Sequence, residues 1–585
     1  MDRYTLKADF CVVGGGLAGM AAAVAAARHG VKTIIIQDRP VFGGNSSSEI
    51  RMHVCGAHGE NRRETGFVEE LLLDNFYYNY SESFSIWDAV LHGKMNFQDN
   101  LTVLMNASVN AAECDGNHVK SVTAWQLTTE HWITVEAKLF ADCSGDGILA
   151  PLTGADFRMG REARHEFNES IAPIEGDTKT MGLSCLFQAR EYATPQPFKA
   201  LPWAYKYTQA NMFKRNCHIR YTNMWWMEVG GLGDSIADTE KCRHELLRIA
   251  LGVWDYIKNE SPEKEQFENF ALDWQGFLPG KRESRRYYGE HILTQNDVEA
   301  EGRFDDIVAY GGWSMDDHFP EGIYHTGTVG TIFHPAPSPF GIPYRTLYSR
   351  NIDNLFCAGR CHSATHSAMS ATRVMSTCSM MGQAVGTAAA IAIRDGLSPA
   401  GVYRNCIAEL QKTLMDDDVW IPWKLREMSK PVQEAELIAS AGEGAENVRN
   451  GFDRDWDDAS NAWTAPVGAS IEYRFKSEVD VDKVRIIFDS NLNRIDPSRR
   501  NERPKNMRYF KALDDVPFTP PNTLVKAFII ETMDASGNWS VAAEETNCFQ
   551  RHVRVPVQKK VHGIRLTPKA TWGAENARVF SLDLI

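Results

Sequence analysis

Three glycines near the start of the chain limit most strongly how it can fold. Gly14, Gly16 and Gly19 form the pattern G-x-G-x-x-G, which follows an apolar strand predicted at residues 10–13 and opens an Ala-rich helix predicted at residues 20–29. In such a turn the first glycine permits a tight bend, the second lets the backbone approach a pyrophosphate, and the third allows close helix–strand packing. The helix N-terminus then offers unpaired N–H groups to the phosphates. We therefore predict a βαβ unit that holds the ADP half of a dinucleotide; the alternative is a glycine-rich turn in an ordinary βαβ unit.

A second predicted strand, at residues 31–36, ends at Gln37 and Asp38. Dinucleotide-binding units usually carry at this point an acid that bonds the ribose. Gln37 departs from that pattern, so we expect either its amide or the Asp38 carboxylate to contact the ribose hydroxyls. The glycines at residues 230–233 lack a preceding strand and a following helix, so they do not form a second unit of this kind. The sequence thus contains a single unit of this kind. A single dinucleotide site favours an enzyme that holds its cofactor tightly over one that receives electrons from a second bound nucleotide.

Bulk properties exclude several classes of protein. A chain of 585 residues is too long for one hydrophobic core, so we expect several domains. With 62 Lys and Arg against 76 Asp and Glu, the net charge of −14 argues against a nucleic-acid or anionic membrane surface. The uncharged residues 11–27 begin with a strand and a glycine turn, which is not the pattern of a membrane span, and the first residues lack the basic start of a signal peptide. We therefore expect a cytoplasmic protein.

The twelve cysteines are scattered, without a C-x-x-C pair or a Cys/His group at zinc spacing. We accordingly predict no metal site. For the close pair Cys357 and Cys361, two buried thiols are favoured over a redox disulfide beside a cofactor.

Composition along the chain predicts an α/β protein of five segments. Residues 1–155 form the first part of the cofactor domain, with a helical insertion at about residues 50–100 and strands at 101–109, 119–125 and 133–140. A mixed α+β segment at 156–335, rich in aromatics, is a candidate substrate or lid domain. Residues 336–398 return to the cofactor domain through a helix of small residues at 372–393, so that domain is discontinuous. A helical linker at 399–431 leads to an antiparallel β-sandwich at 432–585, whose strands include 468–475, 481–489, 552–557 and 561–567.

Several motifs together resemble those of a known family. They lie at residues 8–38, 43–51, 64–66, 142–147, 282–286 with Gly289, 342–345 and 354–389. In these stretches the chain resembles bacterial FAD-dependent oxidoreductases with a glutathione-reductase-like FAD domain. The resemblance implies FAD as the cofactor and a Rossmann-like FAD domain. Residues 447–454 and 461–463 loosely resemble a galactose-binding, discoidin-like module, for which we weigh sugar binding against a purely structural role.

The resemblance also implies positions for the cofactor contacts. A helix start facing flavin N1 would stabilise the negative charge of the reduced ring. Arg360 stands where many wider relatives have an acid, but an arginine suits a pyrophosphate or a flavin carbonyl. The implied contacts are Gly14, Gly16, Leu17, Ala18 and Gly19 for the pyrophosphate; Gly43, Gly44, Asn45, Ser46 and Ser47 for the ribityl chain and pyrophosphate; Val109 for adenine; Cys143, Ser144, Gly145 and Asp146 at the domain's return crossing; Gly359 and Arg360 at the ribityl chain; and Ser370, Thr372 and Arg373, within residues 367–373, at flavin N1.

Catalysis by a flavin needs an acid or base near the carbon that changes oxidation state. His366 is the first choice for proton transfer, with a purely hydrogen-bonding role as the alternative. Arg373 either stabilises reduced flavin, clamps an anionic substrate or pairs with a nearby carboxylate. His318 is the third candidate; His325, Arg285 and Tyr288 are further polar residues of interest. Covalent attachment of flavin to His53, Cys55 or His58 is a less favoured alternative.

We predict an enzyme that oxidises a small polyhydroxylated or carbohydrate-like substrate by hydride transfer to flavin N5. One alternative is a reductase of an unsaturated acid, for which paired arginines clamping a carboxylate would be the signature. Another is a glycan-binding protein whose flavin is structural. The acidic balance speaks against a flavoprotein that modifies tRNA. We expect a small-molecule substrate and no nucleic-acid or membrane partner; the electron acceptor and homo-oligomerisation are left open.

Overall fold

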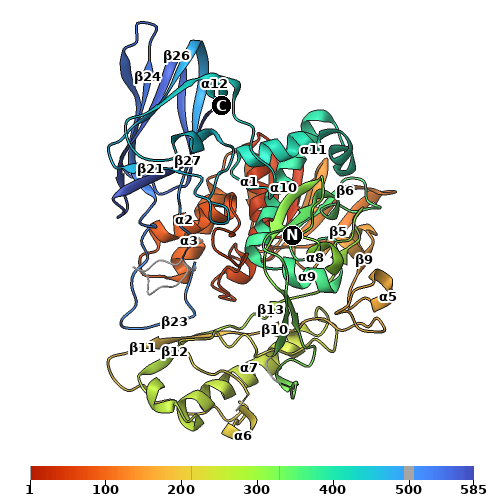
Figure 1. Cartoon of the computed structure of the whole chain (residues 1–585). Coiled ribbons are helices and arrows are strands. Elements are labelled where there is room, and N and C mark those ends of the chain that lie inside the picture. Colours follow the sequence, from red (N-terminus) through yellow and green to blue (C-terminus); the bar gives the residue numbers. More distant parts are fainter. Residues whose placement is uncertain (1, 213, 328–329, 493, 495–505) are drawn as a thin grey trace. The chain divides into compact units, whose positions relative to one another are not determined.

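The computed structural model describes residues 2–212, 214–327, 330–492, 494 and 506–585. The chain divides into two compact units (Figure 1). The first unit comprises Met1–His58, Glu82–Leu410 and Lys505–Val516, and the second comprises Gly59–Ser81, Gln411–Pro504 and Pro517–Ile585. Within the described part of the chain, no helix combines the length and apolar character needed to cross a membrane.

A five-stranded parallel sheet forms the centre of the first unit. Its order is β19-β8-β2-β3-β4, and every neighbouring pair is parallel. Four of the strands are buried along their whole length, as expected for a parallel sheet covered on both faces. The sheet confirms the predicted Rossmann-like architecture. Its strands are β2 (Phe10–Val13), β3 (Thr33–Ile36), β4 (Leu101–Leu104), β8 (Leu139–Asp142) and β19 (Leu355–Cys357).

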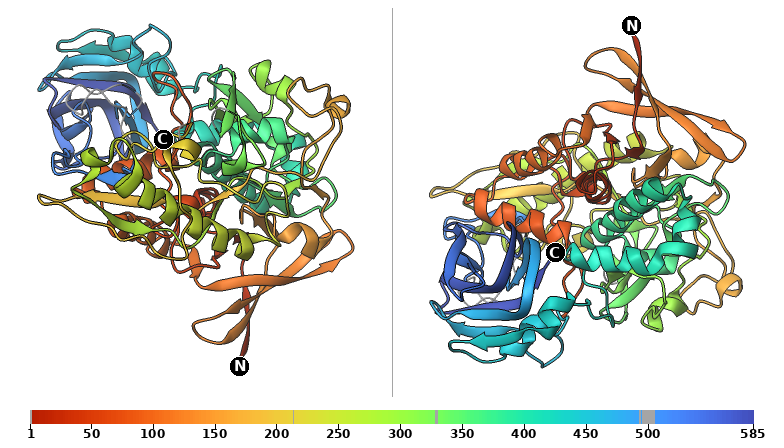
Figure 2. Two further views of the ribbon diagram at one scale, coloured as in Figure 1. Left: turned by 90° about the horizontal axis from the view of Figure 1, so that it is seen from below. Right: turned by 90° about the horizontal axis from the view of Figure 1, so that it is seen from above.

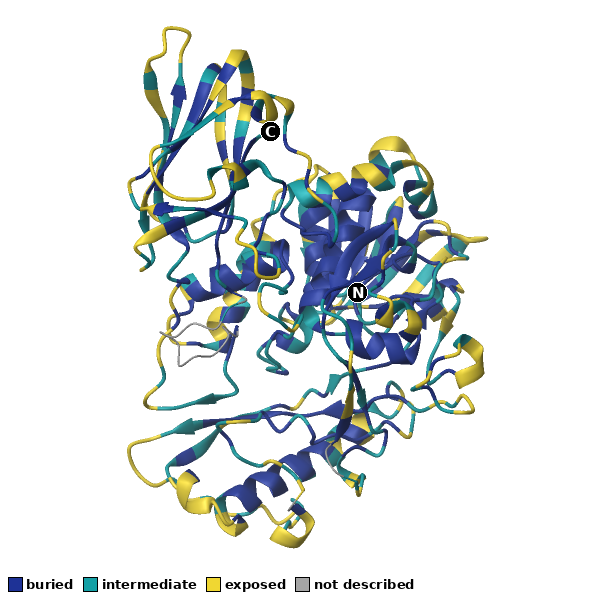
Figure 3. Ribbon diagram, in the orientation of Figure 1, coloured by how far each residue is buried: buried dark blue, intermediate teal, exposed yellow. Residues whose placement is uncertain are grey.

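Two helices from distant parts of the chain pack closely beside this sheet. They are α1 (Leu17–Arg28) and α10 (Met375–Asp395), and both are buried along nearly their whole length (Figure 3). A Cβ added at Gly382 or Gly386 of α10 would meet the carbonyl oxygens of Ala18 or Ala22 of α1 at 1.9 and 2.1 Å. Residues 375–395 thus pack beside the sheet that contains β2 and β3. The helix predicted at 372–393 is divided, because α9 (His366–Thr372) ends before α10 begins.

A separate four-stranded sheet has the order β1-β7-β6-β5. Strand β1 (Arg3–Lys7) joins it in parallel beside β7 (His131–Glu136), so that the N-terminus lies at this sheet (Figure 2). The predicted single strands at 101–109 and 133–140 are wrong. Each divides into one strand of the parallel sheet and one of this sheet, with the chain changing direction at Asn106 (φ 54°) in the first case. The other two strands are β5 (Ala107–Asp115) and β6 (His118–Gln126).

The predicted helical insertion at 50–100 contains two helices that belong to different units. Helix α3 (Phe84–Asn96) lies in the first unit, where Trp87 donates a hydrogen bond to the Ser46 carbonyl. Helix α2 (Phe67–Tyr78) belongs to the second unit.

The middle of the chain builds the rest of the first unit from short strands and helices. Strand β11 lies between β12 and β23 (Phe510–Lys511), and the pairs β10·β13, β14·β9, β15·β18 and β16·β17 are two-stranded. The strands are β9 (Phe157–Arg158), β10 (Leu183–Ser184), β11 (Phe187–Glu191), β12 (Phe270–Gln275), β13 (Gly280–Lys281), β14 (Arg286–Tyr287), β15 (Ile307–Gly311), β16 (Met315–His318), β17 (Thr331–His334) and β18 (Phe340–Pro343). The helices are α4 (Leu149–Thr153), α5 (Arg164–Phe167), α6 (Gln209–Met212), α7 (Thr239–Asp255) and α8 (Gln295–Glu299).

The second unit contains an antiparallel sheet of seven strands in the order β21-β27-β22-β26-β24-β25, with β20 also beside β22. Two of its strands are much longer than predicted: β22 (Ile471–Phe488) and β26 (His552–Thr571). The sequence predicts two strands in place of each, because the local polar residues suggest turns. In the structure the strands continue through these places with shifts of register. The others are β20 (Glu436–Ala439), β21 (Trp463–Pro466), β24 (Val525–Met533), β25 (Trp539–Glu545) and β27 (Asn576–Leu584); α11 (Pro399–Asp416) and α12 (Lys430–Glu434) precede them.

Candidate functional site

A cavity of about 850 Å³ lies in the first unit, within the size range of small-molecule and cofactor sites. Most residues that the resemblance implies as cofactor contacts line it. These are Gly14, Gly16, Leu17, Ala18, Gln37, Asp38, Gly43, Gly44, Asn45, Val109, Cys143, Ser144, Gly145, Asp146, Gly359, Arg360 and Arg373.

The three glycines of the first turn have different surroundings. A Cβ at Gly14 (φ +107°) would lie 2.5 Å from the Cys143 backbone, and one at Gly19 would lie 1.8 Å from the Gly14 carbonyl oxygen. At Gly16 the nearest atom to an added Cβ is Gly44 Cα, 3.9 Å away, so an added methyl group would meet no clash from the chain itself. Gly16 is also the N-cap of α1, whose first turn carries neither a capping side chain nor an acid. The open N-terminus of α1 therefore fits a pyrophosphate.

Gln37 and Asp38 differ in what their side chains can still bind. Gln37 is buried, accepts a hydrogen bond from the Gly15 N–H at 2.7 Å and donates one to the Val41 carbonyl at 3.0 Å. Its amide therefore fixes the glycine turn, and the expectation that it reaches a ribose is not supported by this geometry. Asp38 is largely exposed at the cavity and retains a carboxylate for a hydroxyl group.

The turn after β3 presents its backbone to the cavity. Gly43, Gly44 and Asn45 line the cavity, and residues Gly44–Ser46 form a short 3-10 helix. Ser46 and Ser47 point elsewhere, because their hydroxyls donate to the carbonyls of Gly43 and Gly44 at 2.9 and 2.8 Å. These two serines therefore shape the turn and do not line the cavity.

At the end of β8, an acid is held between two cations. Asp146 accepts hydrogen bonds from Arg360 at 2.8 Å and from Lys281 at 2.6 Å. Burial alone would raise the pKa of Asp146, but these two cations outweigh it and hold the pKa well below its usual range. Arg360 also donates to the Ser284 hydroxyl at 3.0 Å. The arginine that departs from the family pattern thus stabilises a carboxylate at the cavity wall.

Helix α10 presents its N-terminus to the cavity, and α9 does not. The cavity is lined by Arg373, Val374, Met375 and Cys378, around the start of α10. Ser370 and Thr372 are fully buried away from it: Ser370 donates to the Ser367 carbonyl at 2.6 Å, and the Thr372 hydroxyl lies 2.8 Å from His362 Nε2. The predicted helix start facing the cavity is therefore present, but residues 373–378 form it instead of 367–372.

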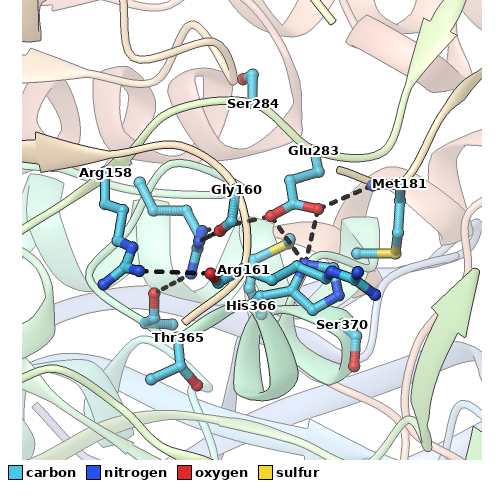
Figure 4. Close-up of polar contacts among 12 residues, drawn as sticks. Arg158, Gly160, Arg161, Met181, Glu283, Ser284, Thr365, His366 and Ser370 are labelled. Atoms are coloured by element: carbon cyan, nitrogen blue, oxygen red, sulfur yellow. Dashed lines mark hydrogen bonds and ion pairs between the residues drawn. The ribbon is translucent and has the colours of Figure 1, made fainter. Parts of the chain in front are cut away.

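The structure places His366 outside the cavity lining. Its Nδ1 lies 2.9 Å from Glu283 (Figure 4). Its Nε2 lies 3.0 Å from Asp317, and its backbone N–H donates to Glu162 at 2.8 Å. Burial by itself lowers the pKa of His366, but Glu283 and Asp317 together outweigh it and raise the pKa to about 10. A histidine that keeps its proton near neutral pH and lies behind the wall is unsuited to take a proton from substrate. This observation corrects our first choice for proton transfer.

Figure 4 shows the surroundings of His366 as one network of charges. Glu283 also accepts from the Met181 N–H at 2.9 Å and lies 3.5 Å from Arg286. Arg286 pairs with Glu162 at 2.9 Å. The network joins α9, the segment before β14 and residues 160–162, and it supports β16 through Asp317.

Four titratable side chains line one side of the cavity, and the buried Glu228 contacts two of them from behind. We call these five residues the charged wall: Arg282, Glu228, His318, Asp316 and Arg373. Arg373 pairs with Asp316 at 3.1 Å, and Arg282 pairs with Glu228 at 3.3 Å. His318 lies between the two acids, with Nδ1 2.7 Å from Glu228 and Nε2 3.3 Å from Asp316. Burial would raise the pKa of Asp316, but His318 and Arg373 lower it below its usual range. Of the roles considered for Arg373, the structure shows pairing with a nearby carboxylate, Asp316. The third candidate, His318, contacts the same carboxylate.

Aromatic side chains also line the cavity, and the sequence predicts them only in part. His53, Cys55 and His58 line the cavity, and His58 stacks on Trp313 with ring centroids 4.1 Å apart. Within the aromatic-rich segment 156–335, Trp225 and Trp313 line the cavity, whereas Trp254 belongs to the hydrophobic core. Asp316, Tyr221, Asn223, Phe333 and Tyr509 also line it but stand in no motif that could have identified them.

Other predicted residues lie outside the lining. His325 stacks on Phe319 with centroids 3.7 Å apart, and Arg285 donates to the Asp146 carbonyl at 3.3 Å. All twelve cysteines are free thiols, including Cys357 and Cys361. Among the described residues, Asp395, Cys406 and Glu409 lie close enough together to hold a metal, but Arg394 pairs with both carboxylates at 2.6 Å.

A comparison with protein families identifies the family of most of the chain. A family model described as FAD dependent oxidoreductase matches residues 9–414, which include every residue that lines the cavity except Tyr509. No curated protein matches the chain.

Solved structures with some similarity include carbohydrate-binding modules. The family 32 module of Streptococcus pneumoniae EndoD is 16% identical, with a TM-score of 0.20, and the match covers 27% of this chain and 99% of the module. The family 32 module of C. perfringens NanJ, solved with galactose, is 15% identical with a TM-score of 0.19, over 27% of this chain and 97% of the module. Chitosan-binding module 1 from Paenibacillus sp. IK-5 is 13% identical with a TM-score of 0.18, over 26% and 95%.

Proposed function

The chain belongs to the family of FAD-dependent oxidoreductases, and from this premise we propose that it oxidises a small, neutral, carbohydrate-like substrate in the cavity of the first unit. The enzyme's cofactor is FAD. When bound, FAD supplies the ring system that accepts a hydride at N5 from the substrate carbon. The chain itself must hold FAD, orient the substrate and move the hydroxyl proton.

We assign cofactor binding to the residues that leave room at the cavity. The N-terminus of α1, uncapped and open at Gly16, binds the pyrophosphate. Asp38 would bond the ribose in place of Gln37, and Val109 would contact the adenine. The N-terminus of α10, beginning after Val374, would favour the negative charge that the flavin gains on reduction.

The pairing of both arginines in the charged wall carries the proposal for a neutral substrate. A reductase of unsaturated acids would need arginines available to clamp a carboxylate, but Arg373 and Arg282 are each already paired with an acid. An added substrate carboxylate would compete with these buried carboxylates and leave one of them unpaired, which is costly. Hydroxyl groups can bond to the wall without displacing either pair. The aromatic side chains that line the same cavity, among them Trp225 beside His318, provide faces for the apolar side of a sugar ring.

We assign proton transfer to His318. Glu228, 2.7 Å from Nδ1, can accept a hydrogen bond from Nδ1–H and so favour the tautomer of neutral His318 that has its lone pair on Nε2. A substrate hydroxyl beside Nε2 then passes its proton to this nitrogen as the hydride leaves the carbon. Asp316, near Nε2, stabilises the resulting imidazolium.

The test is anaerobic mixing of the purified yellow holoprotein with a panel of neutral sugars, polyols, sugar acids and unsaturated acids. Bleaching of the flavin absorbance by neutral sugars or polyols is the expected result. Replacement of His318 by Asn should slow bleaching by about 10²–10⁴-fold while FAD remains bound. In a second arm, the flavin is first reduced with dithionite and then mixed with the unsaturated acids. If neutral sugars leave the oxidised flavin yellow and only unsaturated acids reoxidise the reduced flavin, the proposed direction is wrong and the enzyme is a reductase. An inert flavin together with glycan binding would instead favour the glycan-binding alternative.

A further inference from the structure

One segment of the first unit comes from a distant part of the sequence. Residues 506–516, which we call the insert segment, lie in the chain between β22 and β24 of the second unit's sheet. They nevertheless belong to the first unit, where β23 runs beside β11 (Figure 1). This stretch lies within the β-sandwich predicted at 432–585, so its place in the first unit is not predicted from the sequence.

The insert segment is fixed to the first unit by backbone pairing. Phe510 and Lys511 pair in parallel with Ala189 and Arg190 of β11. Farther along, the Leu513 N–H donates to Glu191 at 3.2 Å.

Side chains at the start of the insert segment add further anchors. Asn506 is buried and accepts a hydrogen bond from the Val54 N–H at 2.7 Å, next to the cavity residues His53 and Cys55. Arg508 pairs with Asp515 at 2.7 Å and with Glu82 at 3.3 Å. Together with the pairing of β23, these contacts hold the insert segment in a defined position within the first unit.

Between these anchors, Tyr509 lines the cavity. Its ring lies beside His53, with centroids 6.3 Å apart, and its hydroxyl donates to the Arg220 carbonyl at 3.4 Å. The nearby lining residues Tyr221 and Trp225 add further aromatic surface. Tyr509 is thus held at the wall of the cavity by its neighbours on both sides in the chain.

We propose that Tyr509 is a specificity-determining residue, whose ring contacts the part of the substrate that does not react. This inference rests on the proposed FAD-dependent oxidation and adds to it the residue that recognises the sugar ring. An aromatic ring presents a weakly negative face, which suits the C–H groups on the apolar side of a pyranose. The C-terminal part of the chain thereby contributes directly to the substrate cavity, through a residue outside the range that the family model matches.

The experiment uses the full-length holoprotein and three variants. Tyr509→Ala removes the ring, Tyr509→Trp keeps an aromatic but enlarges it, and Leu513→Ala is the matched control in the same segment, with an exposed side chain outside the cavity. Two measurements are made on each variant that retains FAD. One is the affinity and rate of sulfite addition to flavin N5, followed by flavin bleaching. The other is the KM and kcat for a neutral sugar that reduces the wild-type flavin.

We expect Tyr509→Ala to raise the KM for the sugar about tenfold with little change in kcat, as for loss of a buried aromatic contact. Sulfite addition should become faster in Tyr509→Ala and slower in Tyr509→Trp, because the cavity is widened or narrowed. Leu513→Ala should match wild type in both measurements. If Tyr509→Ala fails to fold or to hold FAD, the sulfite rate of Tyr509→Trp decides the matter.

Wild-type sulfite kinetics in the folded Tyr509 variants would overturn the inference. If no neutral sugar reduces the wild-type flavin, the proposed oxidation fails, but the sulfite measurement still decides whether Tyr509 forms the cavity wall. The two failures are therefore distinguishable.

Discussion

At the scale of single residues, the glycine turn shows how neighbours determine what a residue does. Gly14 and Gly19 are confined by backbone atoms, whereas a methyl group added at Gly16, at the start of α1, would meet no clash from the chain itself. The same residue type therefore supports the fold at two positions and leaves room for a ligand at the third. Measurements of stability and of FAD binding can distinguish these two roles.

We predict that Gly16→Ala will retain the fold but weaken FAD binding by on the order of tenfold or more, since the new methyl group projects toward the proposed pyrophosphate position. Gly16 has φ −69°, which alanine adopts without strain. Gly19→Ala should instead destabilise the apoprotein by about 1–3 kcal/mol, because its Cβ would overlap the Gly14 carbonyl. Thermal unfolding of the apoprotein and titration with FAD separate the two effects. Wild-type FAD affinity in Gly16→Ala would contradict the assignment of the site.

His366 provides a prediction for the pH dependence of stability. Its pKa is raised from 6.5 to about 10 in the folded protein, so folding favours the protonated ring. The resulting stabilisation is fully present below about pH 6.5 and is lost as the pH rises through about 10. Melting temperatures measured from pH 6 to 11 should fall more in wild type than in His366→Gln. The exposed His92 serves as control: His92→Gln should follow the wild-type curve, and parallel curves for all three proteins would refute the prediction.

Residues within motifs could be predicted from the sequence, and those outside motifs could not. The glycine turn, residues 143–146 and Arg360 all line the cavity as expected. His366 stands in a motif too, but its burial between Glu283 and Asp317 depends on segments far apart in the chain. Asp316 reaches the cavity only because β16 pairs with β17 and packs near α9. Its role follows from tertiary structure alone.

At the scale of elements, the small residues of α10 determine how closely it can approach α1. We predict that Gly386→Ala will lower the free energy of unfolding of the first unit by about 1–3 kcal/mol, because the added methyl group meets the Ala22 carbonyl oxygen. Gly93 in α3 is the matched control, since no atom lies within 4 Å of an added Cβ there. Gly93→Ala should raise stability by about 0.5–1 kcal/mol through better helix propensity. Urea unfolding measures both, and a Gly386→Ala protein as stable as wild type would refute close α1–α10 packing.

The identity of the main elements could be predicted better than their limits. An apolar run such as residues 133–140 shows that the chain is extended, but not that it leaves one sheet for another at Ala137 and Lys138. In β22 and β26 the error is the reverse: local polar residues suggested turns, yet the pairing continues past the irregularities. In both cases the hydrogen-bond partner lies far away in the sequence. Local pattern alone does not specify it.

At the scale of the whole molecule, the chain exchanges segments between its units. Residues 59–81 of the N-terminal region belong to the second unit, and residues 505–516 of the C-terminal region belong to the first. The shift in composition predicts an independent module at 432–585. Such a shift marks a change of secondary structure, but it does not show which distant helix completes the core of the module. The boundaries of foldable fragments therefore differ from those of the predicted segments.

The contribution of α2 to the second unit leads to a prediction about fragments. Tyr77 stacks on Phe549 with centroids 3.9 Å apart, Phe76 packs against Phe518, and Gln550 donates to Asp74 at 2.6 Å. A fragment of residues 411–585 lacks all the partners on α2 and would expose their apolar contacts to water. We predict that it will bind a hydrophobic dye and unfold without a sharp transition, and that an added peptide of residues 59–81 will restore cooperative unfolding. A peptide of residues 84–96, which includes α3 of the first unit, is the control and should have no effect. A sharp transition in the fragment alone would show that the sheet is stable without α2, and the predicted C-terminal module would then be the correct folding unit.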